Sequence, residues 1–313
     1  MSLHVAVLNG GSSLEREVSL ASGSRVTAAL ESRGHTVSRV DVDAHLVDQL
    51  HSMDVDVAFL ALHGSSGEDG TIQSLLSLVG IPHTGPDALA SALAWDKASS
   101  IGLSARAGLA VPAGIVLSQA AFRDLGAAAA MTEVVDRLGS HLVVKPVTGG
   151  SSLGLSIITR SQDLPGAIVG AFSYADRALV EQFVTGTEIA VTVFDGEPLP
   201  PVEIVPRDGA YDFAARYTPG ATDFHAPARL DDAAAKRARE AAESMAQVLG
   251  ARHICRVDMI VTPAGEPVVL EVDTSPGLTT TSLVPLAAQA AGLEFATLCE
   301  RLVELALADM APS

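Results

Sequence analysis

Three carboxylates lie in one short stretch whose residues alternate as in a β-hairpin. Residues 256–262 and 267–272 read as two strands joined by a turn that contains a proline and a glycine. Glu271 and Asp273 share one face of a strand because strand side chains repeat every second residue, and Asp258 on the partner strand can point to that face too. Crowded carboxylates repel one another unless a cation neutralises them, and hard oxygen ligands suit Mg2+. The hairpin therefore predicts a magnesium-phosphate site.

Lysine is rare in this chain, which carries its positive charge mainly on arginine. The lysines are Lys97, Lys145 and Lys236, and Lys236 fits a polar, solvated helix. Lys145 ends a predicted strand at residues 141–146 and precedes a loop, residues 147–154, that is rich in glycine and serine. Backbone N–H groups of such a loop can face a phosphate. The loop is not a Walker A motif, so it predicts either a lid over nucleotide phosphates or a plain flexible hairpin.

Residues 3–8 predict a buried strand, and a glycine-rich turn and a helix follow it. This order is typical of the start of a doubly wound domain, but the turn lacks the third glycine and the acidic partner of a dinucleotide fingerprint. Nucleotide binding at this turn is therefore disfavoured. Glu15, just before the helix, is either a substrate-binding carboxylate or an exposed residue favoured there by the helix dipole.

Two later segments place polar residues at strand ends. The strand at residues 55–62 leads to His63, Glu68 and Asp69, which are either site residues or parts of a turn and helix cap. Glu181 ends another strand, where it suits a hydrogen bond to an adenine or a ribose, although a solvent-facing glutamate has the same sequence pattern. Residues 206–225 predict a long loop whose aromatic residues favour a functional lid over disorder.

Length and composition restrict the class of protein. The 313 residues exceed one typical domain and predict two or three domains around one cleft, with a boundary near residues 85–100. The net charge of −17 excludes general nucleic-acid binding. No apolar run is long enough to span a membrane, and no signal peptide is recognisable, so a cytoplasmic protein is expected. Cys255 and Cys299 are expected to be small buried residues.

The periodic segments predict an α/β protein. Helices are expected at residues 17–32, 71–79, 87–107, 119–138, 231–249 and 294–307. Further strands are expected at residues 36–42, 114–117, 155–158, 178–183 and 189–194.

With these residues in view, the chain closely resembles the D-alanine:D-alanine ligases of the ATP-grasp superfamily. The resemblance runs essentially from end to end, through GGSSLEREVSLASG at 10–23, HGSSGEDGTIQ at 63–73, WDK at 95–97, KP with GSSLG at 145–154, EQFVTGTE at 181–188, YDFAARY at 211–217, and RVD with LEVDTSPGLTTTSLVP at 256–285. It implies a three-domain ATP-grasp fold, with an N-terminal doubly wound substrate-binding domain at 1–95, a central lid domain at 96–180 and a C-terminal domain at 181–313 that carries the metal and substrate sites. The number, order and spacing of the motifs make the assignment specific.

The resemblance also implies a role for each matched residue. The matched ATP contacts are Lys97 and Lys145 on the phosphates, Ser152 in the lid, Glu181 and Glu188 on adenine and ribose, and Arg216. The residues that match substrate-binding and catalytic positions of the family are Glu15, Ser151, Tyr217, His63, Arg256, Gly277, Ser282 and Leu283. Asp258, Glu271 and Asp273 match the positions that hold two Mg2+ ions, for which Mn2+ can substitute. The implied reaction joins two D-alanines through a D-alanyl phosphate for peptidoglycan precursor synthesis. Members of the family are usually homodimers, so the resemblance also implies a homodimer.

Two residues depart from the family pattern and keep an alternative open. Asp273 stands where the family usually has asparagine, and Arg216 stands where it usually has lysine. The changes either compensate for one another or indicate a paralogue that joins other amino acids in a biosynthetic or self-resistance pathway. Tyr217 matches a position associated with a D-amino acid as second substrate. A catalytically weak nucleotide-binding protein is disfavoured because every cationic and oxyanion position holds a competent residue.

Overall fold

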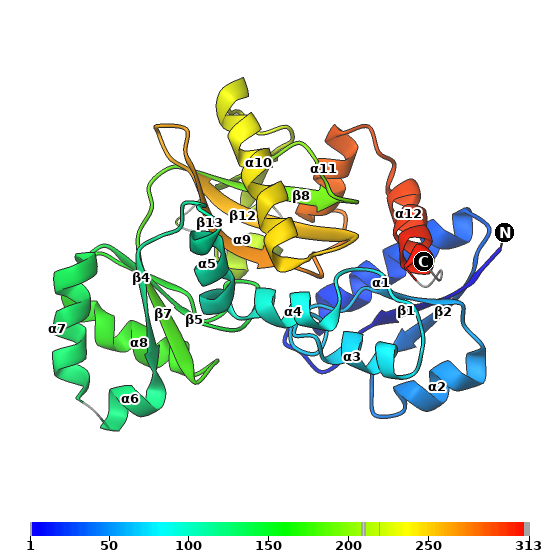
Figure 1. The fold of residues 1–313 in the computed structure, drawn as a ribbon, viewed down its shortest axis with the longest axis horizontal. Coiled ribbons are helices and arrows are strands. Elements are labelled where there is room, and N and C mark those ends of the chain that lie inside the picture. Colours follow the sequence, from blue (N-terminus) through cyan, green and yellow to red (C-terminus); the bar gives the residue numbers. More distant parts are fainter. Residues whose placement is uncertain (1, 125, 208, 210, 219, 310–313) are drawn as a thin grey trace.

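The computed structural model describes residues 2–124, 126–207, 209, 211–218 and 220–309. Three sheets form within these residues, and each has helices packed against it (Figure 1). The sheet near the N-terminus and the sheet of the middle segment lie at opposite ends of the molecule, with the sheet of the C-terminal segment between them. This arrangement agrees with the expected α/β architecture.

The N-terminal segment forms a parallel sheet in the order β2-β1-β3, covered on both faces. Val5 and Val7 share a core with helix α1 and with α12 (Phe295–Ala308), while Ala6 and Leu8 share another with α2 and α3. Alternate residues of β1 thus enter opposite cores, as strand geometry requires. The elements of this segment are β1 (His4–Asn9), α1 (Arg16–Ser32), β2 (Thr36–Asp41), α2 (Leu46–Met53), β3 (Val57–Leu60), α3 (Thr71–Leu78) and α4 (Ala88–Trp95).

The middle segment forms an antiparallel sheet in the order β4-β7-β5-β6, with helices α7 and α8 packed on it. Its strands carry Lys145 and Glu181 toward the neighbouring sheet. The elements of this segment are α5 (Lys97–Arg106), β4 (Gly114–Ser118), α6 (Gln119–Asp124), α7 (Ala127–Leu138), β5 (Leu142–Pro146), β6 (Ser156–Ile158), the 3-10 helix η1 (Ser161–Asp163), α8 (Leu164–Phe172) and β7 (Arg177–Gln182).

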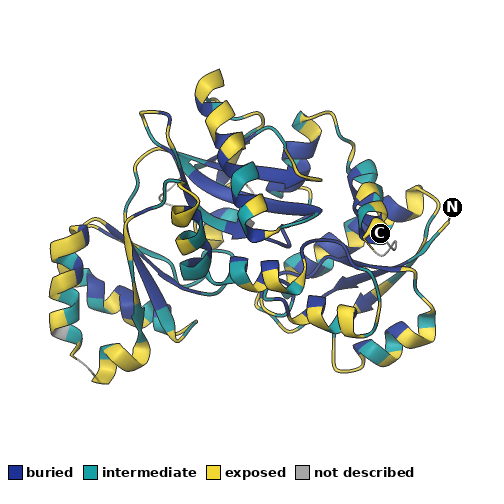
Figure 2. Cartoon of the chain, viewed as in Figure 1, coloured by how far each residue is buried: buried dark blue, intermediate teal, exposed yellow. Residues whose placement is uncertain are grey.

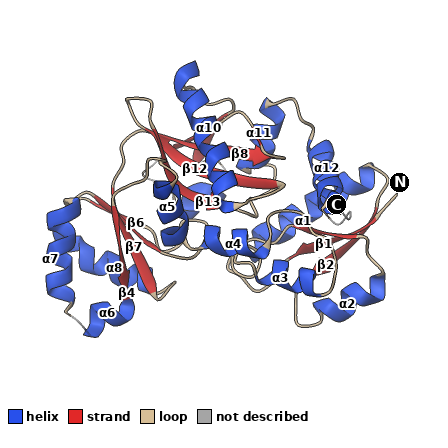
Figure 3. Ribbon diagram, viewed as in Figure 1, coloured by secondary structure: helices blue, strands red, loops and turns tan. Residues whose placement is uncertain are grey.

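The C-terminal segment forms an antiparallel sheet in the order β11-β10-β8-β12-β13, and β9 pairs with the C-terminal end of β8. Its strands are buried beneath α10, which is exposed on its outer side (Figures 2 and 3). The elements are β8 (Thr187–Phe194), β9 (Glu197–Pro198), β10 (Val202–Pro206), α9 (Phe213–Tyr217), β11 (Thr222–His225), α10 (Asp232–Leu249), β12 (Ile254–Val261), β13 (Pro267–Asp273), α11 (Leu283–Ala290) and α12 (Phe295–Ala308).

Three segments differ from the sequence-based expectation. The helix expected at 87–107 is two helices, because Asp96 leaves the helical conformation and its carboxylate accepts a hydrogen bond from the backbone N–H of Ser99 at 2.8 Å, which starts α5. The helix expected at 119–138 is likewise divided into α6 and α7. The expected structureless loop at 206–225 contains α9 and β11, so that expectation was wrong in part.

Chain segments that are distant in sequence share cores. Helix α12 places Leu298 and Leu302 in the core of the N-terminal sheet, and α5 packs on β13 and α10 through Leu103. Cys255 and Cys299 are buried, as expected. Within the part of the chain that the structure describes, no helix is both long and apolar enough to cross a membrane.

Candidate active site

The β12–β13 hairpin places the three carboxylates on one face, as the sequence predicted. Asp258 lies opposite Glu271, and Arg256 lies opposite Asp273, with an irregularity in the pairing after Asp258. Residues that face each other across antiparallel strands, and those two apart on one strand, share a face. The side chains of this set therefore converge on one side of the sheet.

Arg256 neutralises two of these carboxylates. Its Nε and Nη2 donate to the two oxygens of Asp258 at 2.7 and 2.8 Å, and its Nη1 lies 2.9 Å from Oδ2 of Asp273. Burial by itself lowers the pKa of Arg256, but Asp258 and Asp273 outweigh it and hold that pKa well above its ordinary value. The guanidinium is therefore a permanent cation that is held on both sides by the hairpin.

Glu271 is paired with a different cation. Its Oε2 lies 3.3 Å from Nζ of Lys97, which also donates to the backbone carbonyl of Gly149. Burial raises the pKa of Glu271, yet Lys97, Lys145 and Arg216 together lower it to about 2. Glu271 is thus ionised at neutral pH, so the repulsion expected among the three carboxylates is relieved by cations of the chain itself.

The donor set fits magnesium in its chemistry. Asp258 and Glu271 offer hard carboxylate oxygens, which Mg2+ prefers, and a carboxylate oxygen that accepts one hydrogen bond keeps a second lone pair for a ligand. No ready-made group of three or more His, Cys, Asp or Glu ligands exists among the described residues. The other oxygen of Asp273, Oδ1, accepts a hydrogen bond from the backbone N–H of Ser275 at 3.0 Å. Asp258 and Glu271 both line the larger of the two cavities described below, which Asp273 does not line, so they are the carboxylates best placed to hold the metal.

Two adjoining cavities meet at the hairpin. The first, of about 450 Å3, lies between the N-terminal and C-terminal sheets, and the second, of about 840 Å3, lies between the middle and C-terminal sheets. The first is lined by Glu15, His63, Ser151, Arg256, Asp273, Gly277, Ser282 and Leu283, and the second by Lys145, Ser152, Glu181, Glu188 and Asp258. Their common wall consists of Lys97, Gly149, Gly150, Tyr211, Arg216 and Glu271. The residues singled out from the sequence as substrate and ATP contacts are thus separated into neighbouring cavities.

Tyr217 is the exception among these residues. Its backbone ends α9, but its side chain lies outside the described residues. Its expected part in binding the amino acids stays a prediction.

Lys145 and Glu181 form a buried ion pair in the second cavity, where their Nζ and Oε2 atoms are 2.7 Å apart. The other oxygen of Glu181, Oε1, is buried and has no hydrogen-bond partner among the described residues. A buried acceptor without a partner costs free energy, so it favours a ligand that brings a donor. An exocyclic amino group such as that of adenine is a donor of this kind.

Glu188 lies in the same cavity, and no ion pair among the described residues includes it. Burial raises its pKa to about 7, although Arg216 opposes the shift. Glu188 lies opposite Ile260 of β12, so its side chain faces the hairpin carboxylates. The charges of Asp258 and Glu271 raise the pKa of Glu188 further. Glu188 therefore changes its charge near neutral pH.

The glycine-rich loop is closed over the site. Ser151 Oγ donates to Glu15 of the N-terminal segment, while Ser152 Oγ donates to the carbonyl of Tyr211 at 3.0 Å and accepts from Nε of Arg216 at 3.2 Å. A Cβ at Gly150 would lie 2.8 Å from an oxygen of Glu15, so a larger residue there would displace that carboxylate. Adjacent serines thus tie the loop to two different segments.

His63 lines the first cavity as a neutral ring. Burial lowers its pKa. Its Nδ1 lies 2.8 Å from the carbonyl of Ser275, and its Nε2 lies 2.8 Å from Oγ of Ser22. In the neutral tautomer that satisfies both contacts, Nδ1–H donates and Nε2 accepts. Both nitrogens are occupied, so His63 braces the cavity wall.

The structure separates the two acidic residues that follow His63. Glu68 is buried beside the first cavity, where it accepts a hydrogen bond from the N–H of Gly64 at 2.7 Å. Burial, with the charges of Asp273 and Glu15, raises its pKa well above the ordinary value of a glutamate. Asp69 instead accepts from the N–H of Thr71 at 2.9 Å, at the start of α3. Glu68 is therefore a cavity residue and Asp69 a turn residue, and their adjacent positions in one loop gave no sign of this difference.

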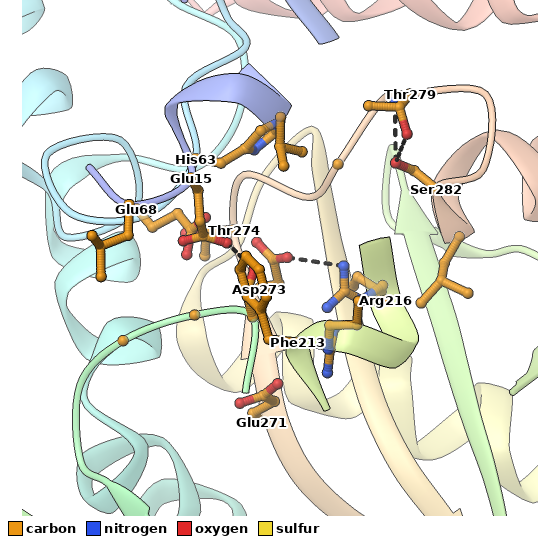
Figure 4. Close-up of a pocket in the computed structure, with 18 of the residues that line it drawn as sticks. Glu15, His63, Glu68, Phe213, Arg216, Glu271, Asp273, Thr274, Thr279 and Ser282 are labelled. Carbon is orange, nitrogen blue, oxygen red and sulfur yellow. Dashed lines mark hydrogen bonds and ion pairs between the residues drawn. The ribbon is translucent and has the colours of Figure 1, made fainter. Parts of the chain in front are cut away.

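Figure 4 shows Glu15, Glu68 and Asp273 together on one side of the first cavity, and Thr279 and Ser282 on another. Ser282 immediately precedes α11, and its Oγ contacts Oγ1 of Thr279 at 2.8 Å and accepts from the Thr279 N–H at 3.1 Å. One side of the cavity is thus acidic, and the other offers hydroxyl groups and a helix N-terminus. An amino acid, with an ammonium and a carboxylate group, matches this polarity.

Sequence reasoning overlooked Tyr211 and Thr279. Tyr211 lines both cavities, and the guanidinium of Arg216 stacks 4.2 Å from the centre of its ring. The motif that contains Tyr211 was recognisable, but its ring position depends on the fold of α9 and β11, which the sequence did not predict.

The chain matches family models at both ends. Residues 45–86 match the model described as the D-ala D-ala ligase N-terminus, and residues 103–304 match the D-ala D-ala ligase C-terminus. The curated D-alanine–D-alanine ligase of Pelotomaculum thermopropionicum is 42% identical over 310 residues, 98% of each chain. The one from Anaeromyxobacter sp. strain Fw109-5 is 46% identical over 301 residues, 96% of each chain.

Solved structures agree in fold. The D-alanine–D-alanine ligase of Bacillus anthracis superposes with a TM-score of 0.87 at 32% identity, covering 98% of both chains. The same enzyme complexed with ATP gives a TM-score of 0.85 at 30% identity, and the VanG D-Ala:D-Ser ligase of Enterococcus faecalis gives 0.84 at 31% identity over 98% of this chain and all of that one. With matches of this extent, the chain belongs to the D-alanine–D-alanine ligase family.

Proposed function

We propose that this enzyme joins two D-alanines into D-alanyl-D-alanine with the cleavage of ATP to ADP and phosphate, and so supplies a peptidoglycan precursor. The observation that best supports this proposal is the wall that the two cavities share. Lys97, Arg216 and Glu271 border both the space for a nucleotide and the space for an amino acid, so a phosphoryl group can pass between them. The curated relatives reported above are D-alanine–D-alanine ligases, which favours this activity over the ligation of other amino acids.

The first step makes a carboxylate reactive. Glu15 holds the ammonium of the first D-alanine. A carboxylate oxygen of that D-alanine attacks the γ-phosphorus of ATP, breaks the bond to the β-phosphate oxygen and forms D-alanyl phosphate. Lys97, Lys145 and Arg216 neutralise the charge on the phosphate oxygens. Asp258 and Glu271, with Asp273 as the third expected ligand, would hold Mg2+ or Mn2+, which would further neutralise the charge of the phosphates.

The second step forms the amide. The amine of the second D-alanine attacks the acyl carbon, with its carboxylate held at Ser282 and Leu283 by the N-terminus of α11. Arg256 and the backbone N–H of Gly277 stabilise the tetrahedral oxyanion, and phosphate leaves. The closed loop at Ser151 and Ser152 excludes water, which would otherwise hydrolyse the acyl phosphate.

The test of this function is the release of ADP, followed with purified enzyme as D-alanine and Mg2+ are varied. We expect release to require both, and we expect mass spectrometry to show D-alanyl-D-alanine as the main product from a panel that includes D-serine and D-lactate. The proposal would be overturned if D-alanine did not stimulate ADP release by the enzyme.

We further propose that the enzyme works in the cytoplasm as a homodimer and has the domain ranges 1–95, 96–180 and 181–313.

Exchanging Asp273 for asparagine tests its expected place at the metal. We expect Asp273→Asn to remain active, because Asp258 still holds Arg256, and to shift the concentration of Mg2+ or Mn2+ that gives half-maximal rate, because the ligand charge changes and its reach does not. Asp195→Asn, which changes an exposed carboxylate paired with Arg301, is the matched control. An unchanged metal dependence in Asp273→Asn would count against coordination by Asp273.

The raised pKa of Glu188 predicts a pH-dependent affinity for the nucleoside. The ribose hydroxyls donate hydrogen bonds, so they favour the ionised carboxylate, which becomes the major form only above a pKa of about 7. Affinity should therefore increase with pH, by about tenfold between pH 6 and pH 8, because about 10% of the groups are ionised one unit below the pKa. Adenosine, which has no phosphate to titrate, is the ligand for calorimetry. Glu188→Gln should remove the dependence, and a slope that survives this change would refute the role of Glu188.

A further inference from the structure

Arg25, which the reaction steps above do not use, connects helix α1 to the loop that carries the oxyanion donor. Its Nη1 donates to the backbone carbonyl of Leu278 at 2.9 Å and to that of Thr279 at 2.7 Å, across 253 and 254 residues of sequence. Its guanidinium also stacks over the ring of Phe295, 3.8 Å from the ring centre, at the start of α12. Arg25 is therefore held in a defined position by two neighbouring segments.

The contact with Leu278 determines the direction of an N–H group. The carbonyl of Leu278 and the N–H of Thr279 belong to one planar peptide unit, so orienting one orients the other. That N–H donates to Oγ of Ser282 at 3.1 Å, and Oγ of Ser282 also contacts Oγ1 of Thr279 at 2.8 Å. Arg25 thus holds the carbonyl end of this peptide unit, and the N–H at its other end orients the hydroxyl of Ser282.

The same loop is held at a second point by α1. Oγ of Ser22 accepts from the N–H of Leu278 at 3.2 Å and contacts the ring of His63. Gly277 lies against Ser282, because a Cβ added to Gly277 would approach Oγ of Ser282 to 2.7 Å. The donors of Gly277 and Ser282 consequently sit in a loop braced from outside the cavity, while Arg25 itself does not line that cavity.

We propose that Arg25 is a positioning residue that sets the affinity for the second amino acid by holding the Leu278–Thr279 peptide and, through it, the hydroxyl of Ser282. The inference rests on the proposed function. Arg25 touches neither substrate, so its effect falls on the capture of the second amino acid and leaves nucleotide binding and acyl-phosphate formation unchanged.

The experiment separates the two half-reactions. Hydroxylamine replaces the second amine, attacks D-alanyl phosphate and gives D-alanyl hydroxamate with release of phosphate, so hydroxamate formation reports the first half-reaction alone. Dipeptide formation reports both. We expect Arg25→Gln to raise the KM for the second D-alanine about tenfold, equivalent to about 1.4 kcal/mol, while the KM for ATP and the rate of hydroxamate formation stay within about twofold of the unmodified enzyme.

Arg33→Gln is the matched control. Arg33 follows the same helix and contacts Glu294, the residue before α12, at 3.1 Å and Glu300 of α12 at 3.6 Å, and none of its contacts with the described residues reaches the Gly277–Ser282 loop. It should leave every rate constant unchanged. Arg25→Lys retains one cationic donor that reaches a single carbonyl, so it should give an intermediate KM, and it serves as the test if Arg25→Gln does not fold.

Several outcomes would overturn the inference. They are an unchanged KM for the second D-alanine in folded Arg25→Gln, an equal rise in Arg33→Gln, equal losses of hydroxamate and dipeptide, and, if Arg25→Gln does not fold, an unchanged KM in Arg25→Lys. If the unmodified enzyme forms neither product, the proposed function itself fails, and this result is distinct from the others.

Discussion

Replacing Arg256 with methionine is expected to lower kcat for dipeptide formation by about 100-fold to 1000-fold. A preorganised donor aimed at a developing oxyanion contributes this much to acyl-transfer reactions, because it is strongest in the transition state. The buried guanidinium, held by Asp258 and Asp273, has little freedom to reorganise during the reaction. Initial rates of ADP release and of dipeptide formation, each at saturating ATP and D-alanine, measure the effect.

The same change should also destabilise the fold. Loss of Arg256 leaves Asp258 and Asp273 without their counter-charge in a buried site, which costs about 3–5 kcal/mol. Urea unfolding of Arg256→Met measures this cost, and adding Asp273→Asn should recover part of the stability because it removes one uncompensated carboxylate. The double variant should recover no activity. A folded Arg256→Met enzyme with kcat close to that of the unmodified enzyme would contradict the assigned role.

Replacing Lys145 with methionine is expected to have the second largest effect. Lys145 and Glu181 are both almost completely buried, with 8% and 3% of their side chains exposed, so removing the ammonium leaves a buried carboxylate unpaired. The free energy of unfolding should fall by about 3–5 kcal/mol. Affinity for ATP should fall at least about 30-fold, because the phosphates lose a desolvated cation.

Two further variants test this explanation for Lys145. Lys236→Met removes a lysine whose pair with Glu240 is exposed, so its stability should change by less than about 0.5 kcal/mol. Adding Glu181→Gln to Lys145→Met should restore stability without restoring ATP affinity. If Lys145→Met unfolds at the same urea concentration as the unmodified enzyme, the buried pair does not stabilise the fold.

Local patterns predicted the parts of the site that depend on one element or two adjacent ones. The two-residue spacing of Glu271 and Asp273 placed them on one face, and the hairpin turn placed Asp258 opposite, as the register shows. Hydrophobic periodicity located most helices and strands because it reflects burial on one face. It did not reveal the break at Asp96, where a side-chain cap competes with a helical pattern that continues on both sides.

Long-range contacts were beyond these patterns. Spacing could not show that Arg256 would neutralise Asp258 and Asp273, because a hard-ligand cluster and an ion-paired cluster have the same carboxylate spacing. It also could not separate Glu68 from Asp69, since their different roles depend on which side chain turns toward the cavity.

The sequence by itself determined the fold class, the family and which residue types are available for phosphoryl and acyl transfer, because strand and helix periods and motif spacing are local properties of the chain. Only the tertiary structure decided how the sites share their cations, that Ser151 and Ser152 face different cavities, and that Arg25 reaches the loop at Leu278. Those features arise where segments far apart in sequence pack together, and the free energy of such contacts depends on distance and burial, which no local pattern contains.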